Sequence, residues 1–165
     1  SAYKYKWKEK EMKRKLIEKD FIQTMDHVDT WKEAIRIAAK PLLEHQCIQE
    51  SYIDAMIQTV IDLGSYIVIA PDIAMPHARS EGRVLKNSIS ILKLEKPVYF
   101  DSDEASKATF IMPIACVDNE NHLTMLAKVA EILGDPDTME KILHTNDAEK
   151  LYEMFETLTF EEETQ

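Results

Sequence analysis

Apolar side chains recur at helical spacing in two stretches of the N-terminal half of the chain. Thr30 and Glu33 form a capping box at the start of the first stretch, and Pro41 is expected to kink or tighten its last turn. The second stretch covers residues 51–63 and stops at Gly64, a residue that suits the position after a helix. The spacing predicts two amphipathic helices, with inward faces made of Trp31, Ala34, Ile35, Ala38 and Leu42 in the first and Ile53, Met56, Ile57, Val60 and Leu63 in the second.

After Gly64 the pattern changes to short apolar runs that are typical of strands. Residues 66–70 are apolar throughout, which predicts a strand covered on both faces. Residues 88–94 alternate and then change phase, as a strand with a bulge would, and residues 98–100 are a third candidate. A fourth run, 108–116, is apolar on both faces, and Pro113 within it indicates a bulge or an early end.

Helical spacing returns in the last third of the chain. An inward stripe of one helix is predicted at Leu123, Leu126, Ala127, Ala130 and Leu133, closed by Gly134. Asp135 and Pro136 read as the cap and first residue of a short helix, and a last helix begins near residues 146–149. The order of helices, strands and helices predicts an α/β fold in which a sheet is covered by helices on both faces.

The charge of the chain is distributed unevenly. The 165 residues suggest one compact domain with a net charge of −10, yet residues 1–19 hold eight basic side chains against three acidic ones, which leaves −15 on the rest. Residues 1–15 are read as a basic extension, either solvated or the start of a helix running to Lys19, and residues 161–165 as a frayed acidic tail. Alternating aromatic and basic residues at positions 3–8 could bind single-stranded nucleic acid. The acidic body disfavours nucleic acid and favours basic protein partners.

Composition excludes several classes of site. The three glycines, Gly64, Gly82 and Gly134, lie too far apart for a P-loop or a dinucleotide fingerprint. The two cysteines, Cys47 and Cys116, make no disulfide framework. No apolar stretch approaches the roughly 18 residues of a membrane span, and no apolar run follows the basic start as in a signal peptide. A cytoplasmic protein is therefore expected.

His77 is the first candidate for chemistry. It lies in a segment that follows an apolar run and is bracketed by two prolines, Pro71 and Pro76, which predicts a stiff loop at the end of a strand. Ala78 leaves room for a ligand beside the imidazole, and Arg79 supplies a cation that could bind phosphate oxygens. A histidine that is merely hydrogen-bonded to a loop carbonyl remains the alternative.

His122 is the second candidate, at the start of the helix that carries the leucine stripe. A helix N-terminus attracts anions and favours the neutral form of an imidazole, although His122 could also simply help to cap the helix. A metal site made of Cys116, Asp118 and His122 matches no standard spacing, so no metal is expected. No Ser-His-Asp arrangement can be read from the sequence, and the other histidines, His27, His45 and His144, are read as structural.

Two motifs together resemble a known family. The first is Ile73-Ala74-Met75-Pro76-His77-Ala78-Arg79, and the second is Asn119-Glu120-Asn121-His122-Leu123-Thr124-Met125-Leu126. Their order and separation are similar to those of the IIA components of the mannitol/fructose-type branch of the bacterial phosphoenolpyruvate-dependent sugar phosphotransferase system. The resemblance covers about residues 16–160. Ala78-Arg79 resembles the ascorbate- or pentitol-type members more than the mannitol ones.

The resemblance implies a fold and a function. The fold would be a mixed sheet of about four to five strands with helices on both faces. His77 would accept a phosphoryl group from HPr, whose basic face suits an acidic partner, and pass it to a IIB component that serves a membrane IIC component. No cofactor would be needed, and a homodimer is left open. The alternative is a regulatory module whose phosphorylation state on His77 signals to a partner.

The residues that would balance the phosphoryl charge are a further implication of the resemblance. His122 is expected to stabilise the phosphoryl group on His77. Mannitol members carry an arginine upstream of the first motif, but the predicted helix 51–63 contains no Arg or Lys. We therefore expect Arg79 to supply the cation.

Overall fold

A mixed five-stranded sheet forms the centre of the molecule in the computed structural model, which describes residues 11–163. The strand order is β2-β6-β7-β4-β3. The pairs β2–β6 and β4–β7 are parallel, whereas β6–β7 and β3–β4 are antiparallel. The predicted α/β class and mixed sheet are thus confirmed. The strands of this sheet are β2 (Ile22–Met25), β3 (Val68–Ala70), β4 (Asp72–Ala74), β6 (Ile91–Tyr99) and β7 (Lys107–Ile111).

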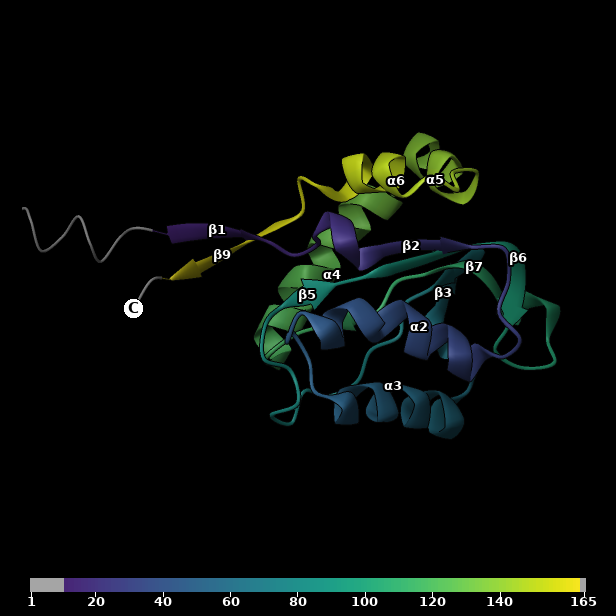
Figure 1. Cartoon of the computed structure of the whole chain (residues 1–165), viewed down its shortest axis with the longest axis horizontal. Coiled ribbons are helices and arrows are strands. Elements are labelled where there is room, and N and C mark those ends of the chain that lie inside the picture. Colours follow the sequence, from purple (N-terminus) through teal and green to yellow (C-terminus); the bar gives the residue numbers. More distant parts are fainter. Residues whose placement is uncertain (1–10, 164–165) are drawn as a thin grey trace, which may run out of the picture.

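Helices cover both faces of this sheet. Figure 1 shows α2 and α3 on one side and α5 and α6 on the other, with α3 packed on the outside of α2. A short two-stranded sheet, β5 (Ser88–Ile89) with β8 (Ile114–Ala115), lies beside the main sheet. The helices are α2 (Trp31–Glu44), α3 (Glu50–Leu63), α4 (Asn119–Leu133), α5 (Pro136–Leu143) and α6 (Ala148–Phe155), and the short 3₁₀ turns are η1 (Lys19–Phe21), η2 (Ser65–Ile67) and η3 (Glu104–Ser106). Within residues 11–163, none of the helices is both long and apolar enough to span a bilayer.

Two predicted helix ends are confirmed, the start of α2 at Thr30 and the end of α3 at Gly64, whereas the predicted cap Asp135 of α5 makes no side-chain capping hydrogen bond. At the start of α2 the backbone N–H of Glu33 donates to Thr30 Oγ1 at 3.2 Å. Gly64 follows α3 with φ 81°, a left-handed conformation that a residue without Cβ adopts at little cost. Asp118 caps α4 by accepting from the N–H of Asn121 at 2.8 Å.

Four of the residues predicted on the inward helix faces are exposed instead, and these include Ala127 and Ala130 on α4. Leu63, at the end of α3, is 65% exposed, and Leu123, at the start of α4, is 69% exposed. The buried face of α4 consists of Met125 and Val129, four residues apart. The apolar residues of α4 lie on two neighbouring faces of the helix, so their spacing alone does not decide which face is buried. In the folded protein the face with Met125 and Val129 packs against the body.

The strands differ from the prediction in five places, and one of them is β2, which forms at residues 22–25 where no strand was predicted. Residues 66–70 do not form a buried strand: they form η2 and then β3, an edge strand on which Ile69 is 52% exposed. Residues 72–74 form strand β4 within the segment predicted as a loop. The 88–94 run divides into β5 and the start of β6, and residues 98–100 are largely the end of β6, whose register shifts between Lys93 and Val98. Pro113 separates β7 from β8, as predicted.

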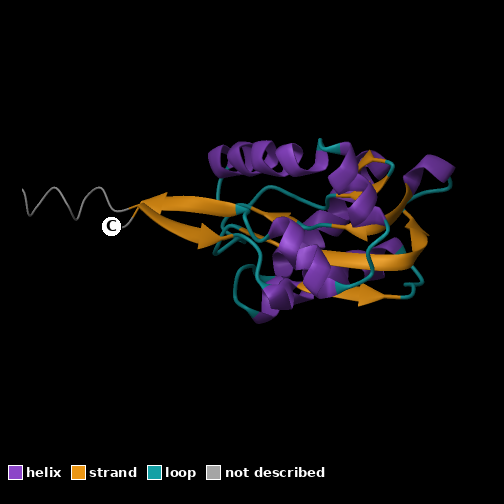
Figure 2. Ribbon diagram, turned by 90° about the horizontal axis from the view of Figure 1, so that it is seen from above, coloured by secondary structure: helices purple, strands orange, loops and turns teal. Residues whose placement is uncertain are grey.

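The two terminal segments pair with each other. β1 (Glu11–Lys15) and β9 (Thr159–Glu163) form an antiparallel ribbon in which Lys13 lies opposite Glu161. This ribbon extends away from the body, as Figures 1 and 2 show. Of the two alternatives for the basic start, the helix running to Lys19 is therefore wrong for residues 11–15, and residues 161–163 form a strand rather than a frayed tail. Neither segment by itself signals a strand that only the other can pair. The aromatic and basic residues at positions 3–8 lie outside the described residues.

The buried side chains on the α6 side of the sheet give a test of the packing. Phe155 on α6 is fully buried and stacks on Phe110 of β7, with 5.9 Å between ring centroids. We expect Phe155→Ala to lower the free energy of unfolding by about 3–5 kcal/mol, because it removes a large apolar side chain and leaves a cavity. Urea unfolding measures this loss. Glu153→Ala, on the exposed side of the same helix, should change stability little, and an equal loss in both variants would contradict the packing.

Candidate functional site

The backbone around His77 is held at the end of β4 by the neighbouring strands. The N–H of Met112 donates to the carbonyl of Ala74 at 2.8 Å, and the N–H of Ile114 donates to the carbonyl of Pro76 at 2.9 Å. Residue 74 is therefore bound to the segment that follows β7, and residue 76 to the first residue of β8. The tight attachment explains why the residues before His77 are buried while the imidazole itself is half-buried.

The imidazole of His77 has a defined tautomer. Its Nδ1 lies 2.7 Å from the carbonyl oxygen of Met75. A carbonyl oxygen can only accept, so Nδ1 carries the proton and Nε2 of the neutral ring keeps its lone pair. The arrangement presents Nε2 as the nucleophilic atom of this side chain.

His122 lies next to His77, as the role that the family resemblance implies for it requires. The two ring centroids are 5.1 Å apart, with 35° between the ring planes. Burial lowers the pKa of His122, and the positive charge that His77 can carry lowers it further. Both effects favour a neutral imidazole at His122 near pH 7.

Tyr66 contacts the imidazole of His77, and no functional role was predicted for it. Its ring meets His77 edge to face at a centroid distance of 6.0 Å, and 43% of the residue is exposed. Partial burial raises the pKa of its hydroxyl, so the side chain stays neutral. Tyr66 was predicted as part of a buried strand, and only its position in η2 brings it to the histidine.

These side chains line one open cleft of about 610 Å³. Its walls come from α3, the loop after His77 and the start of α4, and they bring together both predicted histidines and Arg79. Carboxylates also lie there, at Asp62, Glu81 and Asp118. The full lining is Ala55, Gln58, Thr59, Asp62, Leu63, Tyr66, His77, Ala78, Arg79, Ser80, Glu81, Arg83, Cys116, Asp118, Asn119 and His122.

A profile of one protein family matches most of the chain. The family is described as "Phosphoenolpyruvate-dependent sugar phosphotransferase system, EIIA 2", and the match covers residues 15–157. The chain belongs to this family. It is therefore a IIA component, a phosphotransfer protein of the sugar phosphotransferase system.

Similar proteins include IIA components named for two different sugars. The ascorbate-specific EIIA component of Mycoplasma pneumoniae is 32% identical over 74% of this chain and 77% of its own length. The solution structure of the mannitol-specific cryptic IIA of Escherichia coli has 28% identity and a TM-score of 0.78, over 86% of this chain and 95% of that one. The Escherichia coli mannitol IIA, solved in complex with phosphorylated IIB, shares the fold at 24% identity and a TM-score of 0.71, over 86% and 96% of the two chains.

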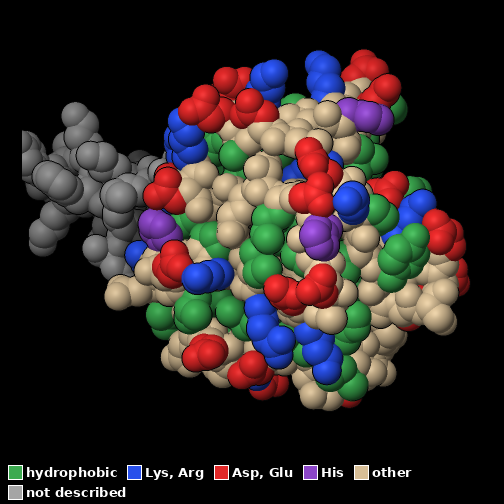
Figure 3. Space-filling view, turned by 45° about the vertical axis from the view of Figure 1, so that its right-hand side comes forward, with side chains coloured by type: hydrophobic (Ala, Val, Ile, Leu, Met, Phe, Trp, Pro, Cys, Tyr) green, Lys and Arg blue, Asp and Glu red, His purple; other side chains and the backbone are tan. Residues whose placement is uncertain are grey.

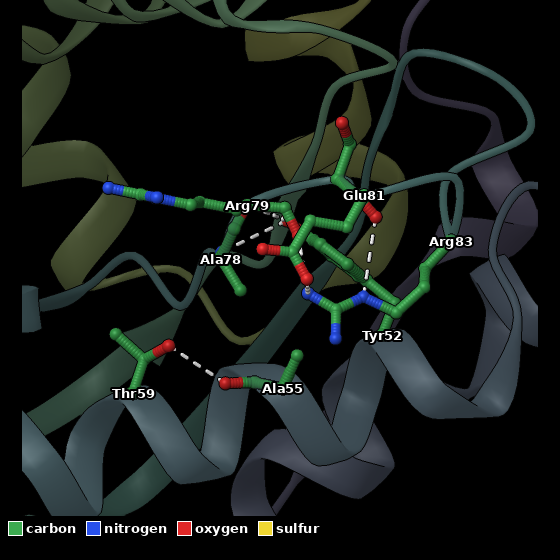
Figure 4. A network of polar contacts seen from close by, with 8 residues as sticks. Tyr52, Ala55, Thr59, Ala78, Arg79, Glu81 and Arg83 are labelled. Carbon is green, nitrogen blue, oxygen red and sulfur yellow. Dashed lines mark hydrogen bonds and ion pairs between the residues drawn. The ribbon is translucent and has the colours of Figure 1, made fainter.

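Arg83 is a second arginine in the cleft of this IIA chain, and the sequence analysis did not single it out. Its Nη2 donates to the carbonyl of Arg79 at 2.7 Å and its Nε to that of Ser80 at 3.3 Å, while Glu81 lies 3.5 Å from Nη2. Figure 4 shows the side chain of Arg79 extending away from Arg83 and Glu81. Arg83 thus closes the turn after His77, and Arg79 is left extended beside the cleft.

The helix wall of the cleft carries no cation. α3 contributes Ala55, Gln58, Thr59, Asp62 and Leu63 to the lining, in agreement with the absence of Arg and Lys noted in the sequence. The cations in the described lining are therefore the two arginines of the loop that follows His77. The only indication of Arg83 in the sequence is its position in that loop, four residues after Arg79.

Cys116 reaches the cleft but is a packing residue. Its Sγ lies 3.5 Å from Met125 Sδ, and burial raises the pKa of the thiol to about 12. A thiol that stays protonated at neutral pH is a poor nucleophile and a poor metal ligand. Among residues 11–163, no three His, Cys, Asp or Glu side chains converge as metal ligands would.

Proposed function

We propose that His77 carries a phosphoryl group between HPr and a IIB component. The observation that supports this most directly is the hydrogen bond from Nδ1 of His77 to the carbonyl of Met75. It fixes the proton on Nδ1 and leaves Nε2 as the attacking atom, in a side chain that lines an open cleft. A relay protein needs such an accessible nucleophile, because both its donor and its acceptor are other proteins.

The proposed transfer exchanges one N–P bond for another. Nε2 of His77 attacks phosphorus in line while the bond from phosphorus to the phosphohistidine nitrogen of HPr breaks. The imidazole gains positive charge as the new bond forms, and the Nδ1–H bond to Met75 stabilises that charge. In the second transfer a cysteine of IIB attacks phosphorus, the Nε2–P bond breaks and His77 returns to its neutral form.

His122 and Arg79 are the proposed partners of the phosphoryl oxygens. His122 lies beside His77 and has a neutral ring that can donate one N–H, and Arg79 is an exposed cation in the cleft wall. Donors aimed at the three equatorial oxygens stabilise the charge of the transition state without a metal ion. The incoming phosphoryl group is already activated on nitrogen, so no nucleotide is required at this step.

The charge of the chain supports a basic phosphoryl donor. Figure 3 shows acidic side chains spread over one face with basic ones among them, so no single acidic patch dominates that view. Attraction of HPr would then come from the net charge of −10, which acts at a distance and weakens with added salt. For the acceptor, the mannitol IIA solved with phosphorylated IIB offers a precedent in the same fold.

The test is phosphorylation of the unaltered chain. We expect incubation with phosphoenolpyruvate, enzyme I and HPr to add the mass of one phosphoryl group, labile in acid and stable in base, as expected for phosphohistidine. Peptide mapping under basic conditions should locate it at His77. Omitting HPr is the control and should prevent labelling. An unlabelled chain, or a label on another residue, would overturn the proposal.

A further inference from the structure

The residues on both sides of His77 are bound to one residue of β8. The N–H of Ile114 donates to the carbonyl of Pro76 at 2.9 Å. The carbonyl of Ile114 accepts from the hydroxyl of Tyr52 at 2.7 Å, and that hydroxyl accepts from the N–H of Ala78 at 3.1 Å. His77 therefore lies between two attachments, one made directly by backbone and one made through a side chain of α3.

The Tyr52 hydroxyl donates one hydrogen bond and accepts another. It has one proton and can accept as well as donate. The carbonyl of Ile114 at 2.7 Å is the closer acceptor, while the carbonyl of Ala78 lies at 3.3 Å. Burial raises the pKa of Tyr52, so the proton is retained at any pH in ordinary use. Figure 4 shows Tyr52 reaching from the helix toward Ala78.

The ring of Tyr52 packs in the core, whereas its hydroxyl makes the hydrogen bonds to the loop and to β8. The ring is part of the core, since the residue is only 1% exposed. The hydroxyl joins Ala78 to β8, and without it the N–H of Ala78 and the carbonyl of Ile114 lose the partners that they have in this structure. A loop released on this side can move the imidazole of His77 and weaken the Nδ1 bond to Met75.

We infer that Tyr52 is a positioning residue for His77, acting through the backbone of Ala78. The inference rests on the proposed role of His77 as phosphoryl acceptor. In-line attack depends on the placement of Nε2, and a displacement of about 1 Å can cost on the order of 10²-fold in rate. The hydroxyl touches neither the imidazole nor the incoming group, so its effect is purely on placement.

The experiment compares Tyr52→Phe with two matched variants. Tyr99→Phe removes a hydroxyl that bonds to Glu104 on the surface, and Ser90→Ala removes a buried hydroxyl that bonds to the carbonyl of Ala38 at 2.6 Å. Transfer from phosphorylated HPr is measured in a single turnover, and thermal unfolding is recorded for each variant. We expect Tyr52→Phe to slow transfer by about tenfold to 10²-fold, with both controls at the wild-type rate even where Ser90→Ala loses similar stability.

Two further measurements isolate placement from folding. The ¹⁵N resonances of the His77 ring report the Nδ1–H tautomer without any phosphoryl transfer, and we expect that tautomer to be less populated in Tyr52→Phe. Incorporation of 4-fluorophenylalanine at position 52 fills the space of the hydroxyl without its proton. It should slow transfer as Tyr52→Phe does, and it replaces that variant if Tyr52→Phe does not fold.

The outcomes separate the two proposals. Wild-type rates and an unchanged His77 tautomer in both position-52 variants would overturn the positioning role, with the acceptor role intact. Equal slowing in Tyr52→Phe and Ser90→Ala would also overturn it, because general destabilisation would then account for the effect. A wild-type chain that takes no label would instead overturn the proposed function.

Discussion

His77→Ala is expected to take up no phosphoryl group from HPr under conditions that label the wild-type chain completely. The substitution removes Nε2, the nitrogen that the Met75 carbonyl leaves unprotonated, and no other group in the cleft can replace it. Cys116 is held as a thiol by burial, and His122 has a lowered pKa but lies beside the acceptor position rather than in it. Intact mass measured at neutral or basic pH gives the result.

The control for this prediction is a histidine outside the cleft. His45 follows α2 and packs against Phe21, and His45→Ala should be labelled like the wild-type chain. His77→Ala should also unfold at nearly the same temperature as the wild-type chain, because a half-buried ring on the cleft wall contributes little to the core. Full labelling of His77→Ala would show that the acceptor is another residue.

His122→Ala is expected to slow transfer by about 10²–10³-fold while the final extent of labelling stays the same. The loss reflects one hydrogen-bond donor removed from the transition state, whereas the nucleophile is retained. Stopped reactions followed by mass spectrometry give the rate. His144→Ala, at the exposed end of α5, is the control and should transfer normally.

The titration of His122 provides a second readout of its role. In the free protein, burial and His77 hold its pKa below the ordinary value. A histidine with a depressed pKa contributes stability that is present above its unfolded pKa and lost as the pH falls toward its folded pKa. A phosphoryl group on His77 would place negative charge beside the ring and raise this pKa. NMR titration before and after phosphorylation should show that rise, and complete loss of labelling in His122→Ala would instead mean that the two histidine roles are reversed.

The positive charge in the lining of the cleft comes from arginine side chains. α3 offers no Arg or Lys, so the described cations of the lining are Arg79 and Arg83, both in the loop that follows His77. The two differ in their contacts: Arg83 is bonded to the carbonyls of Arg79 and Ser80, whereas the side chain of Arg79 extends away from that turn. Arg79 is therefore the arginine that is free of the turn, as the proposed phosphoryl partner requires.

Local signals in the sequence were sufficient for the helices and for the two histidines. Capping at Thr30, the glycine after residue 63 and the apolar spacing predicted α2 and α3, because helix hydrogen bonds join residues close in sequence. His77 and His122 were found from the residue types around them. Their distance of 5.1 Å between centroids could not be read from either motif.

The sequence by itself determined the class of fold, the family and the candidate histidines, since these depend on periodicity and on short motifs. Tertiary structure alone decided which strand is an edge, that residues 11–15 pair with residues 159–163, and that α4 buries Met125 instead of Leu123. It also decided that Tyr52 and Arg83 hold the loop around His77. Strand pairing and side-chain hydrogen bonds join residues distant in sequence, so their partners are chosen only when the chain has folded.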